Sequence, residues 1–373
     1  MATTGQEEFT LDTAAELAAE EGGGKAIEGK SPWVIAGRRL RRNRVALASL
    51  AIFILVVVCC LLAPVYSHNV SHIGENEVRS EAVVVKNGQR VHVISQGRTT
   101  IKNGVPTIVP GGIPIGPQWG ATGGKYVLGA DELGRDIATR LLYGGLNSLF
   151  IGATSAAICT VLSVILALLA GYFGGIVDWI ISRFFDLIWA FPVILLAIAL
   201  GTALAVNGFH HGFHLFGVFI GLNLAGNSLW ITVGIIAFVF IPYIGRPLRG
   251  QVLALRNREF IEAATAQGAG SVRIMFTELL PNIASSVLVL FTLIVANAIL
   301  TEVGLSYLNA GVKFPSPSWG TMIEEGQSSL ATAPQISLFA GIAIAITVLA
   351  INIFGDGLRD ALDPRAKIRI EHG

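Results

Sequence analysis

The chain has 373 residues, of which 53% are hydrophobic and 14% are charged, and its formal net charge is +1. Soluble domains usually carry about 25% charged residues, and the charges here are segregated, which leaves long uncharged runs. The composition therefore excludes an ordinary soluble domain and predicts an all-α membrane protein; the net charge says nothing about partners, and no segment predicts nucleic-acid binding.

Residues 1–44 are predicted to form a tail and an interfacial helix on the cytoplasmic side. The first 30 residues are acidic and poor in large apolar side chains, which is typical of a segment without a packed core. Residues 24–31 fit the letters of the pattern GxxxxGK[ST], but a phosphate-binding loop needs a strand before it and a helix after it. Neither is indicated, so we predict no nucleotide site. The arginines of residues 38–44 predict a helix along the membrane surface; the alternative is positive charge that only marks the end of the first span, and both interpretations place the segment in the cytoplasm.

Long apolar runs predict six membrane-spanning helices, since a span needs about 20 apolar residues. We expect kinks at Pro192 and Pro242. The amphipathic segment 174–183 is predicted to lie in the cytoplasmic interface. The predicted spans are 45–64, 144–171, 187–204, 228–245, 283–301 and 335–354.

Residues 65–143 are predicted to be an extracytoplasmic, β-rich insertion after the first span. Two β-favouring runs, 83–86 and 89–94, flank Asn87-Gly88, and this dipeptide is a strong signal for a β-hairpin. The insertion is equally consistent with contact to a substrate-delivering protein and with a passive cover over a pore.

Charged residues gather where this insertion meets the second span. They form the sequence Leu128-Gly-Ala-Asp-Glu-Leu-Gly-Arg-Asp136. Charges held this close can pair and fix a turn, so we favour a structural ion-pair cluster over direct contact with a substrate. The predicted structural residues are Asp131, Gly134, Arg135 and Asp136.

Three histidines, His210, His211 and His214, lie in the segment 207–226, which is too short to cross the membrane and is predicted to be an outer turn or a re-entrant piece. No carboxylate or thiol is near them in sequence, and a histidine cluster alone is a weak indication of a metal site. We predict no metal site and no catalytic residues, because no nucleophile–base set or acid/base carboxylate pair recurs in the apolar core.

Residues 258–282, within a predicted loop of residues 246–283, are the only long charged, helix-patterned segment between two apolar spans in the C-terminal half. Asn257 and Ser271 are predicted N-caps of two short helices. Gly268 and Gly270 separate the helices, and Pro281 is expected to end the second one. Five arginines in or beside this segment place it in the cytoplasm.

The sequence Glu262-Ala-Ala264, followed by Gly268-Ala269 and Leu280-Pro-Asn282, resembles the EAA loop of ABC-importer permeases. Glu278 stands where that family often has histidine. In the family the loop is a cytoplasmic coupling loop, and its first helix docks into a groove of the ATPase subunit. The resemblance implies ATPase-subunit docking by Glu262, Ala263, Ala264, Gly268 and Ala269.

Three further stretches resemble the dipeptide/oligopeptide (and nickel) subfamily, C-type subunit. They are residues 128–144, Pro317-Ser-Trp-Gly320 and the tail that starts at Gly355. Ala130, Thr139 and Asn309-Ala310 depart from the usual pattern. By this resemblance 144–356 is the permease core and 357–373 a cytoplasmic tail. The further structural-motif residues are Trp319, Gly320, Asp356, Arg359 and Asp360.

Polar groups within spans usually face a bundle interior or a transport pathway. Asn297 and Glu302 are candidates for lining a pathway, and hydrogen bonding between helices is the alternative role. The family resemblance implies a homologous second permease subunit, two ABC ATPase subunits and an extracytoplasmic substrate-binding protein as partners. No cofactor is expected in this chain, since ATP and Mg would bind the ATPases.

The resemblance implies ATP-driven alternating access in the bacterial or archaeal cell membrane, with both termini cytoplasmic. The first helix of the EAA loop would act as a rigid lever. Di- or oligopeptides are the expected substrates, with nickel or another small solute as the alternative. A stand-alone secondary transporter is disfavoured, because coupling-ion acids and inverted repeats are not evident.

Overall fold

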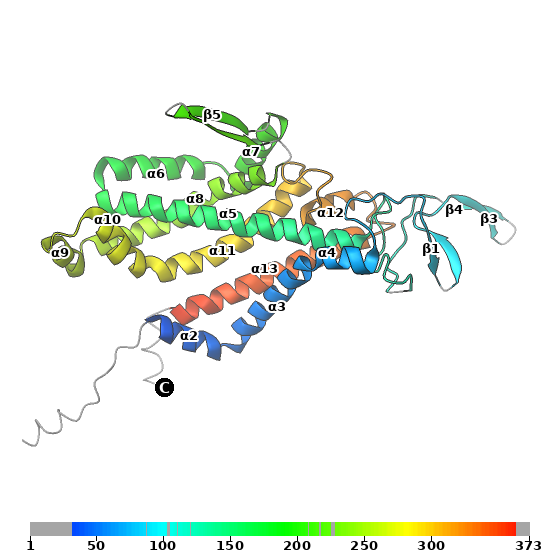
Figure 1. Cartoon of the computed structure of the whole chain (residues 1–373), viewed down its shortest axis with the longest axis horizontal. Helices are drawn as coiled ribbons and strands as arrows, with labels where there is room; N and C mark the ends of the chain where they lie inside the picture. Colours follow the sequence, from blue (N-terminus) through cyan, green and yellow to red (C-terminus); the bar gives the residue numbers. More distant parts are fainter. Residues whose placement is uncertain are drawn as a thin grey trace, which may run out of the picture.

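The computed structural model describes residues 32–362, apart from 87, 103–104, 110, 120, 208, 216–217 and 225–227. It is a mostly helical bundle, elongated along its helices, with β-hairpins projecting from it (Figure 1). Five helical segments within the described residues are long and apolar enough to cross a membrane. They are α3 (Arg44–Leu61), α5 (Ile137–Phe173), α8 (Leu229–Arg256), the run Ser271–Tyr307 and α13 (Gln335–Leu362).

Two further helices, α6 (Gly175–Trp189) and α7 (Val193–Asn207), meet at an angle of 87°. If this bent pair is counted as one broken span, the structure has a sixth crossing. The predicted kink at Pro192 is therefore a sharp break, which divides the predicted span 187–204 between the end of α6 and α7. Pro192 lies at the break; it lacks an N–H donor, and it disfavours helical backbone at the residue before it. The chain turns there instead of bending gently.

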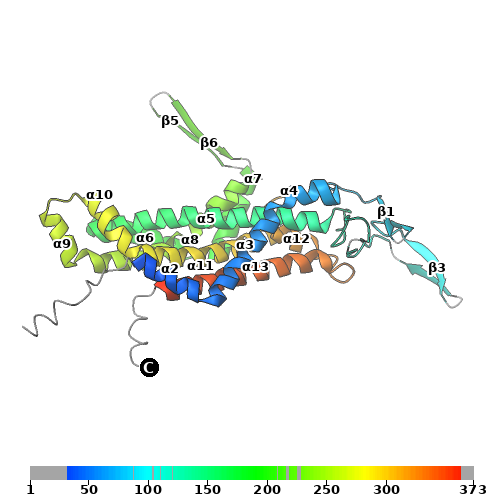
Figure 2. The same ribbon diagram turned by 60° about the horizontal axis from the view of Figure 1, so that its bottom comes forward.

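The helix α5 is the centre of the bundle and packs along α8 and α11 (Leu280–Tyr307) (Figure 2). Ser155 donates a hydrogen bond to the carbonyl oxygen of Val233 (3.1 Å), and Ser163 donates to that of Ile241 (2.9 Å). Small residues that hydrogen-bond across helices hold bundles together in lipid, where burial of apolar surface gives little net gain. The helix α3 packs mainly on α13, at the edge of this core.

Other predicted span boundaries also change, and two of the changes affect the neighbouring charged segments. Ser228 caps α8, as the predicted start of a span at 228 implies, but α8 continues through Pro242 and Pro247 to Arg256. The charged segment therefore begins as helix at 246 rather than as loop. The helix α5 begins at Ile137, seven residues before the predicted span, because Asp136 caps it.

The predicted hairpin at Asn87-Gly88 is confirmed. β1 (Val83–Lys86) pairs antiparallel with β2 (Gln89–His92), with Lys86 opposite Gln89, and Gly88 has φ +79°. Positive φ at the turn matches the twist of the strands. A second hairpin joins β3 (Arg98–Lys102) to β4 (Val105–Val109).

The histidine-bearing segment is a third hairpin, between β5 (Phe209–Leu215) and β6 (Val218–Leu224). In its register His210 is opposite Asn223 and His214 is opposite Phe219. The predicted turn is thus an extended β-ribbon. Its side chains lie outside the described part of the structure, so the metal prediction is not tested.

The remaining short elements close the two ends of the bundle. Before α3 lies α2 (Pro32–Arg42), and after it come α4 (Ala63–Tyr66) and the π-helical turn η1 (Ser67–Ser71). The charged segment holds α9 (Glu259–Ala266), α10 (Ser271–Arg273) and the π-helical η2 (Ile274–Leu279), and α12 (Trp319–Glu325) precedes α13.

Candidate functional site

The elbow, defined here as α9 and the turn 267–270, projects from one end of the bundle (Figures 1 and 2). Glu259 and Glu262 occupy the first turn of α9, where negative charge interacts favourably with the helix dipole. The N-cap is Arg258, without a side-chain hydrogen bond, so the predicted cap at Asn257 is wrong by one residue. Asn257 instead ends α8.

The turn that ends α9 is a Schellman motif centred on Gly268. The N–H of Ala269 donates to the carbonyl of Ala264 (3.0 Å), and the N–H of Gly268 donates to that of Thr265 (2.9 Å). This pairing needs a left-handed residue after the C-cap, and Gly268 has φ +81°. The predicted glycine break is confirmed, and its cause is backbone conformation, because a Cβ at this position would meet open space.

One apolar side chain, Ile261, anchors α9 to the bundle. It is 4% exposed and belongs to the main core, and Ala264 and Ala269 pack against that core. Glu262, Ala263 and Gly268 are exposed. The sequence analysis missed Ile261, which follows the exposed Phe260, so the local sequence does not indicate which of these two apolar residues is buried.

Behind the elbow lies a hollow of about 690 Å³, lined by the end of α5, by Arg256 and Asn257, and by α9. The guanidinium of Arg256 donates to the carbonyl oxygen of Tyr172 (3.2 Å), in the last turn of α5. Cationic side chains there satisfy carbonyls that lack a partner within the helix. Arg256 thus ties the end of α5 to the end of α8, directly before the elbow.

The second helix of the segment does not end at Pro281. α10, η2 and α11 continue as one helical run from Ser271 to Tyr307, and Pro281 stands in the first turn of α11. The π-helical stretch η2 precedes it, and this wider turn accommodates a proline, which removes one N–H and would clash with a normal α-turn. Gly270, not Ser271, is the N-cap of α10.

Two ion pairs attach α6 to α8. Arg249 forms two hydrogen bonds with Asp178, one of them 2.6 Å, and Arg246 pairs with Asp186. The guanidinium of Arg246 also lies over the ring of Trp189, 4.0 Å from its centroid, a favourable cation–π geometry. These arginines, which the sequence analysis used only for topology, hold α6 along the bundle up to its 87° break.

At the opposite end of α5 the structure brings together the ion-pair cluster, defined as Asp131, Arg135, Arg140 and Glu325. Arg135 contacts Asp131 (2.6 Å) and Glu325 (2.7 Å), and Arg140 contacts Glu325 (2.8 Å) and Asp131 (3.6 Å). Both arginine side chains are at most 3% exposed. Two cations and two carboxylates in one buried set leave no net charge for a ligand.

Asp136 is not part of the ion-pair cluster. One of its oxygens accepts hydrogen bonds from the N–H (2.9 Å) and the hydroxyl (2.6 Å) of Thr139, so it caps α5. Burial raises the pKa of Asp136, although both hydrogen bonds oppose that shift. Glu325, which takes the expected place of Asp136, is 190 residues from Arg135 in sequence, and no local pattern indicates it.

Gly134 lies in the turn that presents the ion-pair cluster. It has φ +74°, and a Cβ there would lie 2.5 Å from the carbonyl oxygen of Arg79. Its own carbonyl accepts a hydrogen bond from the buried hydroxyl of Tyr126 (3.1 Å). Both conformation and space require glycine here.

Trp319 and Gly320 are the first residues of α12, and they allow it to pack closely against the bundle. The indole N–H of Trp319 donates to the carbonyl of Leu141 (3.0 Å), and a Cβ on Gly145 would lie 2.9 Å from the indole ring. A Cβ on Gly320 would lie 2.6 Å from the carbonyl oxygen of Val303. The two residues therefore let α12 approach α5 and α11 closely.

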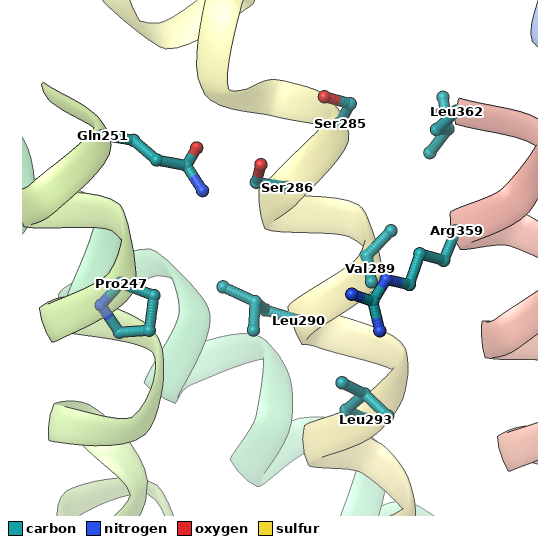
Figure 3. A pocket seen from close by; sticks show the side chains of 9 residues that line it. All are labelled: Pro247, Gln251, Ser285, Ser286, Val289, Leu290, Leu293, Arg359 and Leu362. Carbon is teal, nitrogen blue, oxygen red and sulfur yellow. The ribbon is translucent and has the colours of Figure 1, made fainter. Parts of the chain in front are cut away.

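Asp356, Arg359 and Asp360 are all exposed near the end of α13. The close contacts of this stretch come from its glycines: a Cβ on Gly355 would lie 2.7 Å from the hydroxyl of Thr292. Arg359 extends toward Val289 over a groove of about 350 Å³ between α8, α11 and α13 (Figure 3). The groove also has a polar wall of Gln251, Ser285 and Ser286.

The two candidate pathway residues lie in different surroundings. Asn297 is exposed on α11 and donates to the carbonyl of Leu293 (2.8 Å), at the end of the groove. Glu302 is completely buried and accepts a hydrogen bond from Ser306 (2.8 Å). Ser306 also accepts the N–H of Val312 (3.0 Å), so Glu302 supports the loop after α11.

Comparison with known proteins decides the family. Residues 163–368 match the family described as binding-protein-dependent transport system inner membrane component. The chain belongs to this family. Residues 31–77 also match the N-terminal TM domain of oligopeptide transport permease C.

Three relatives illustrate the range of similarity. The dipeptide transport system permease protein DppC of Alkalihalophilus pseudofirmus is 33% identical over 337 residues, which cover 90% of this chain and 91% of the relative. The oligopeptide transport system permease protein OppC of Bacillus subtilis is 32% identical, covering 94% and 96%. The glutathione transport system permease protein GsiD of Pectobacterium atrosepticum is 39% identical, covering 64% and 73%.

Membership makes the chain a multi-pass membrane permease, the transmembrane subunit of a binding-protein-dependent ABC importer. The ATPase is a separate subunit, and a binding protein is a further partner of such an importer. The resemblance seen in the sequence is thereby confirmed, and the stand-alone secondary transporter is excluded.

Proposed function

We propose that this chain forms one half of a transmembrane pathway for di- or oligopeptides, together with a homologous second permease, two ATPase subunits and a substrate-binding protein. ATP and Mg would bind the ATPases and not this chain. Support for the peptide substrate comes from the names of the relatives, which are dipeptide, oligopeptide and glutathione permeases. Both termini and the elbow would be cytoplasmic, as the arginines flanking the elbow indicate.

The observation that carries the proposal is the construction of the elbow. Ile261 anchors α9 in the core, whereas Glu262, Ala263 and Gly268 form an exposed, small-residue surface. Such a surface allows the backbone of α9 to approach a groove in the ATPase closely. Arg256, at the end of α8 directly before the elbow, hydrogen-bonds to α5, so a push on α9 would be passed to two long helices.

The substrate would pass along the exposed face of α11. This face continues from the groove at Ser286 and Leu293 to Asn297, one helical turn further on. It combines hydroxyl, amide and apolar groups, which suit a peptide backbone and its side chains. Glu302 is not part of this proposal, because it is buried among other residues of the fold.

A co-purification experiment tests the docking surface. The complete importer is expressed with a tagged ATPase and either Glu262→Arg or Gly268→Trp in this chain, and the permease recovered with the ATPase is measured. Both variants are expected to lower recovery at least tenfold, because a cation and a large ring are placed on the exposed face. Glu81→Arg is the control, since Glu81 is also exposed but lies in the insertion.

Undiminished recovery with both variants would show that α9 is not the docking site. A separate uptake assay tests the substrate, using membrane vesicles that contain the complete importer and labelled dipeptide, longer peptide or nickel. ATP-dependent peptide uptake is expected. Uptake of nickel alone would overturn the peptide assignment while leaving the docking result intact.

A further inference from the structure

The exposed arginines of α2 and of the start of α3 have no partner among the residues that the structure describes. Arg38, Arg41, Arg42 and Arg44 are exposed, and no ion pair or side-chain hydrogen bond between side chains that the structure describes involves them. Four exposed cations within seven residues form a local positive surface that attracts negative charge. The sequence analysis places this segment at the membrane surface, but neither it nor the family assignment says which ligand the arginines bind.

The helical geometry sorts α2 into two faces. Arg38, Arg41 and Arg42 fall at i, i+3 and i+4, and therefore on one side of the helix. Ala36 is buried and Leu40 is half-buried on the other side, where α2 packs against α13. The arginine face thus points away from the bundle because the opposite face is occupied.

The position of this face relative to α3 indicates what covers it. Asn43 interrupts the two helices with an extended backbone (φ −82°, ψ 93°), and its side chain caps α3 by accepting the N–H of Ala46 (3.1 Å). α2 therefore bends away from α3 at the end of that span (Figures 1 and 2). In α3 itself only 17% of the apolar window is buried, which is typical of a helix in contact with lipid.

Exposed apolar residues flank the arginines on both sides. Val34 is 54% exposed and Val45 is 66% exposed. A row of guanidinium groups beside exposed aliphatic side chains, at the end of a lipid-facing span, matches a phospholipid headgroup above its acyl chains. Guanidinium binds phosphate through paired hydrogen bonds.

We propose that Arg38, Arg41, Arg42 and Arg44 form a binding site for the phosphate headgroups of anionic phospholipids, which fixes α2 in the membrane surface. The acidic residues of the 1–30 segment are the competing source of negative charge within this chain. The proposal concerns lipid and is independent of the transported substrate and of docking at the elbow.

The experiment counts lipids retained by the purified full chain in native mass spectrometry, from detergent micelles with equal phosphatidylglycerol and phosphatidylcholine. Arg41→Gln/Arg42→Gln is compared with Lys86→Gln/Arg90→Gln, which removes the same charge from the β1–β2 hairpin. An arginine near an anionic surface contributes about fivefold in affinity, so the first variant should bind phosphatidylglycerol on the order of 25-fold more weakly, and the control should bind as the unaltered chain.

Salt provides a second readout of the same site. Raising the ionic strength from about 0.01 M to about 1 M shortens the screening length from about 30 Å to about 3 Å, and retention of phosphatidylglycerol should fall with it. Equal retention of the two lipids, or equal loss in both charge variants, would overturn the proposal. Binding that emerges only after deletion of residues 1–30 would overturn it in favour of the acidic segment as occupant.

Discussion

The two ends of α5 differ in how they hold their neighbours. At Ile137 the ion-pair cluster and the close contacts of Trp319 and Gly320 leave little exposed surface. At Phe173 the neighbouring elbow is held by one buried isoleucine and a Schellman turn, and Arg256 joins only α8 to α5. Buried charge pairs specify one arrangement but make any loss of a partner costly. A sparsely anchored, exposed turn tolerates change and remains available to another protein.

The largest expected effect is at the ion-pair cluster. Glu325→Gln leaves Arg135 and Arg140 buried with Asp131 as the single carboxylate, and removing one partner of a buried pair costs about 3–5 kcal/mol. We expect about 3 kcal/mol, since Glu325 itself is 23% exposed. Thermal unfolding of the purified chain measures this against Glu324→Gln, a change beside it that should stay within about 0.5 kcal/mol.

Unchanged unfolding of the Glu325→Gln variant would show that water enters the cluster. The end of α5 at Ile137 would then tolerate loss of a contact as the end at Phe173 does, and the contrast between the two ends would be lost.

A smaller loss is expected where α12 meets α11. Gly320→Ala places a Cβ 2.6 Å from the carbonyl oxygen of Val303, and overpacking of this kind costs about 1–3 kcal/mol. Gly341→Ala is the matched control, because a Cβ there meets nothing within 4 Å and alanine favours helix. The control should equal or exceed the unaltered chain in unfolding temperature; a lower value for both would point to a general intolerance of methyl groups.

The smallest effect is predicted at the elbow. Gly268→Ala forces a side chain into the left-handed region, at about 1–2 kcal/mol, and the cost should remain local. Amide hydrogen exchange at residues 268 and 269 should accelerate, while global unfolding changes little. Gly270→Ala serves as control, since Gly270 has φ −71°; equal acceleration in both variants would refute the role assigned to the Schellman motif.

Local signals were enough to predict the elbow and the β1–β2 hairpin. Gly268 and Gly88 both have a left-handed backbone, and a few neighbouring residues of the sequence are enough to indicate it. The two prolines had different outcomes: the kink expected at Pro192 is a break of 87°, whereas the helix expected to stop at Pro281 continues. Whether the helix breaks or continues at a proline depends on the packing around it and, at Pro281, on the π-helical turn before it. The proline alone does not predict either feature.

The ion-pair cluster was predicted only in part. Asp131 and Arg135 are four residues apart and could be paired by inspection, whereas Glu325 reaches them only because Trp319 and Gly320 bring α12 against α5 and α11. Asp136 was assigned to the cluster because it is adjacent in sequence, although its hydrogen bonds cap α5. Long-range contacts of this kind follow from the assembled fold.

The unbroken course of α5 has a consequence for communication across the bilayer. Its 37 residues extend roughly 55 Å, well beyond the hydrocarbon thickness of about 30 Å. Rotation of this helix about its axis would turn Arg140 at one extremity and Tyr172 at the other in concert. Spectroscopic probes attached near both extremities should consequently change their signals with a single time constant, whichever side of the membrane the rotation starts from.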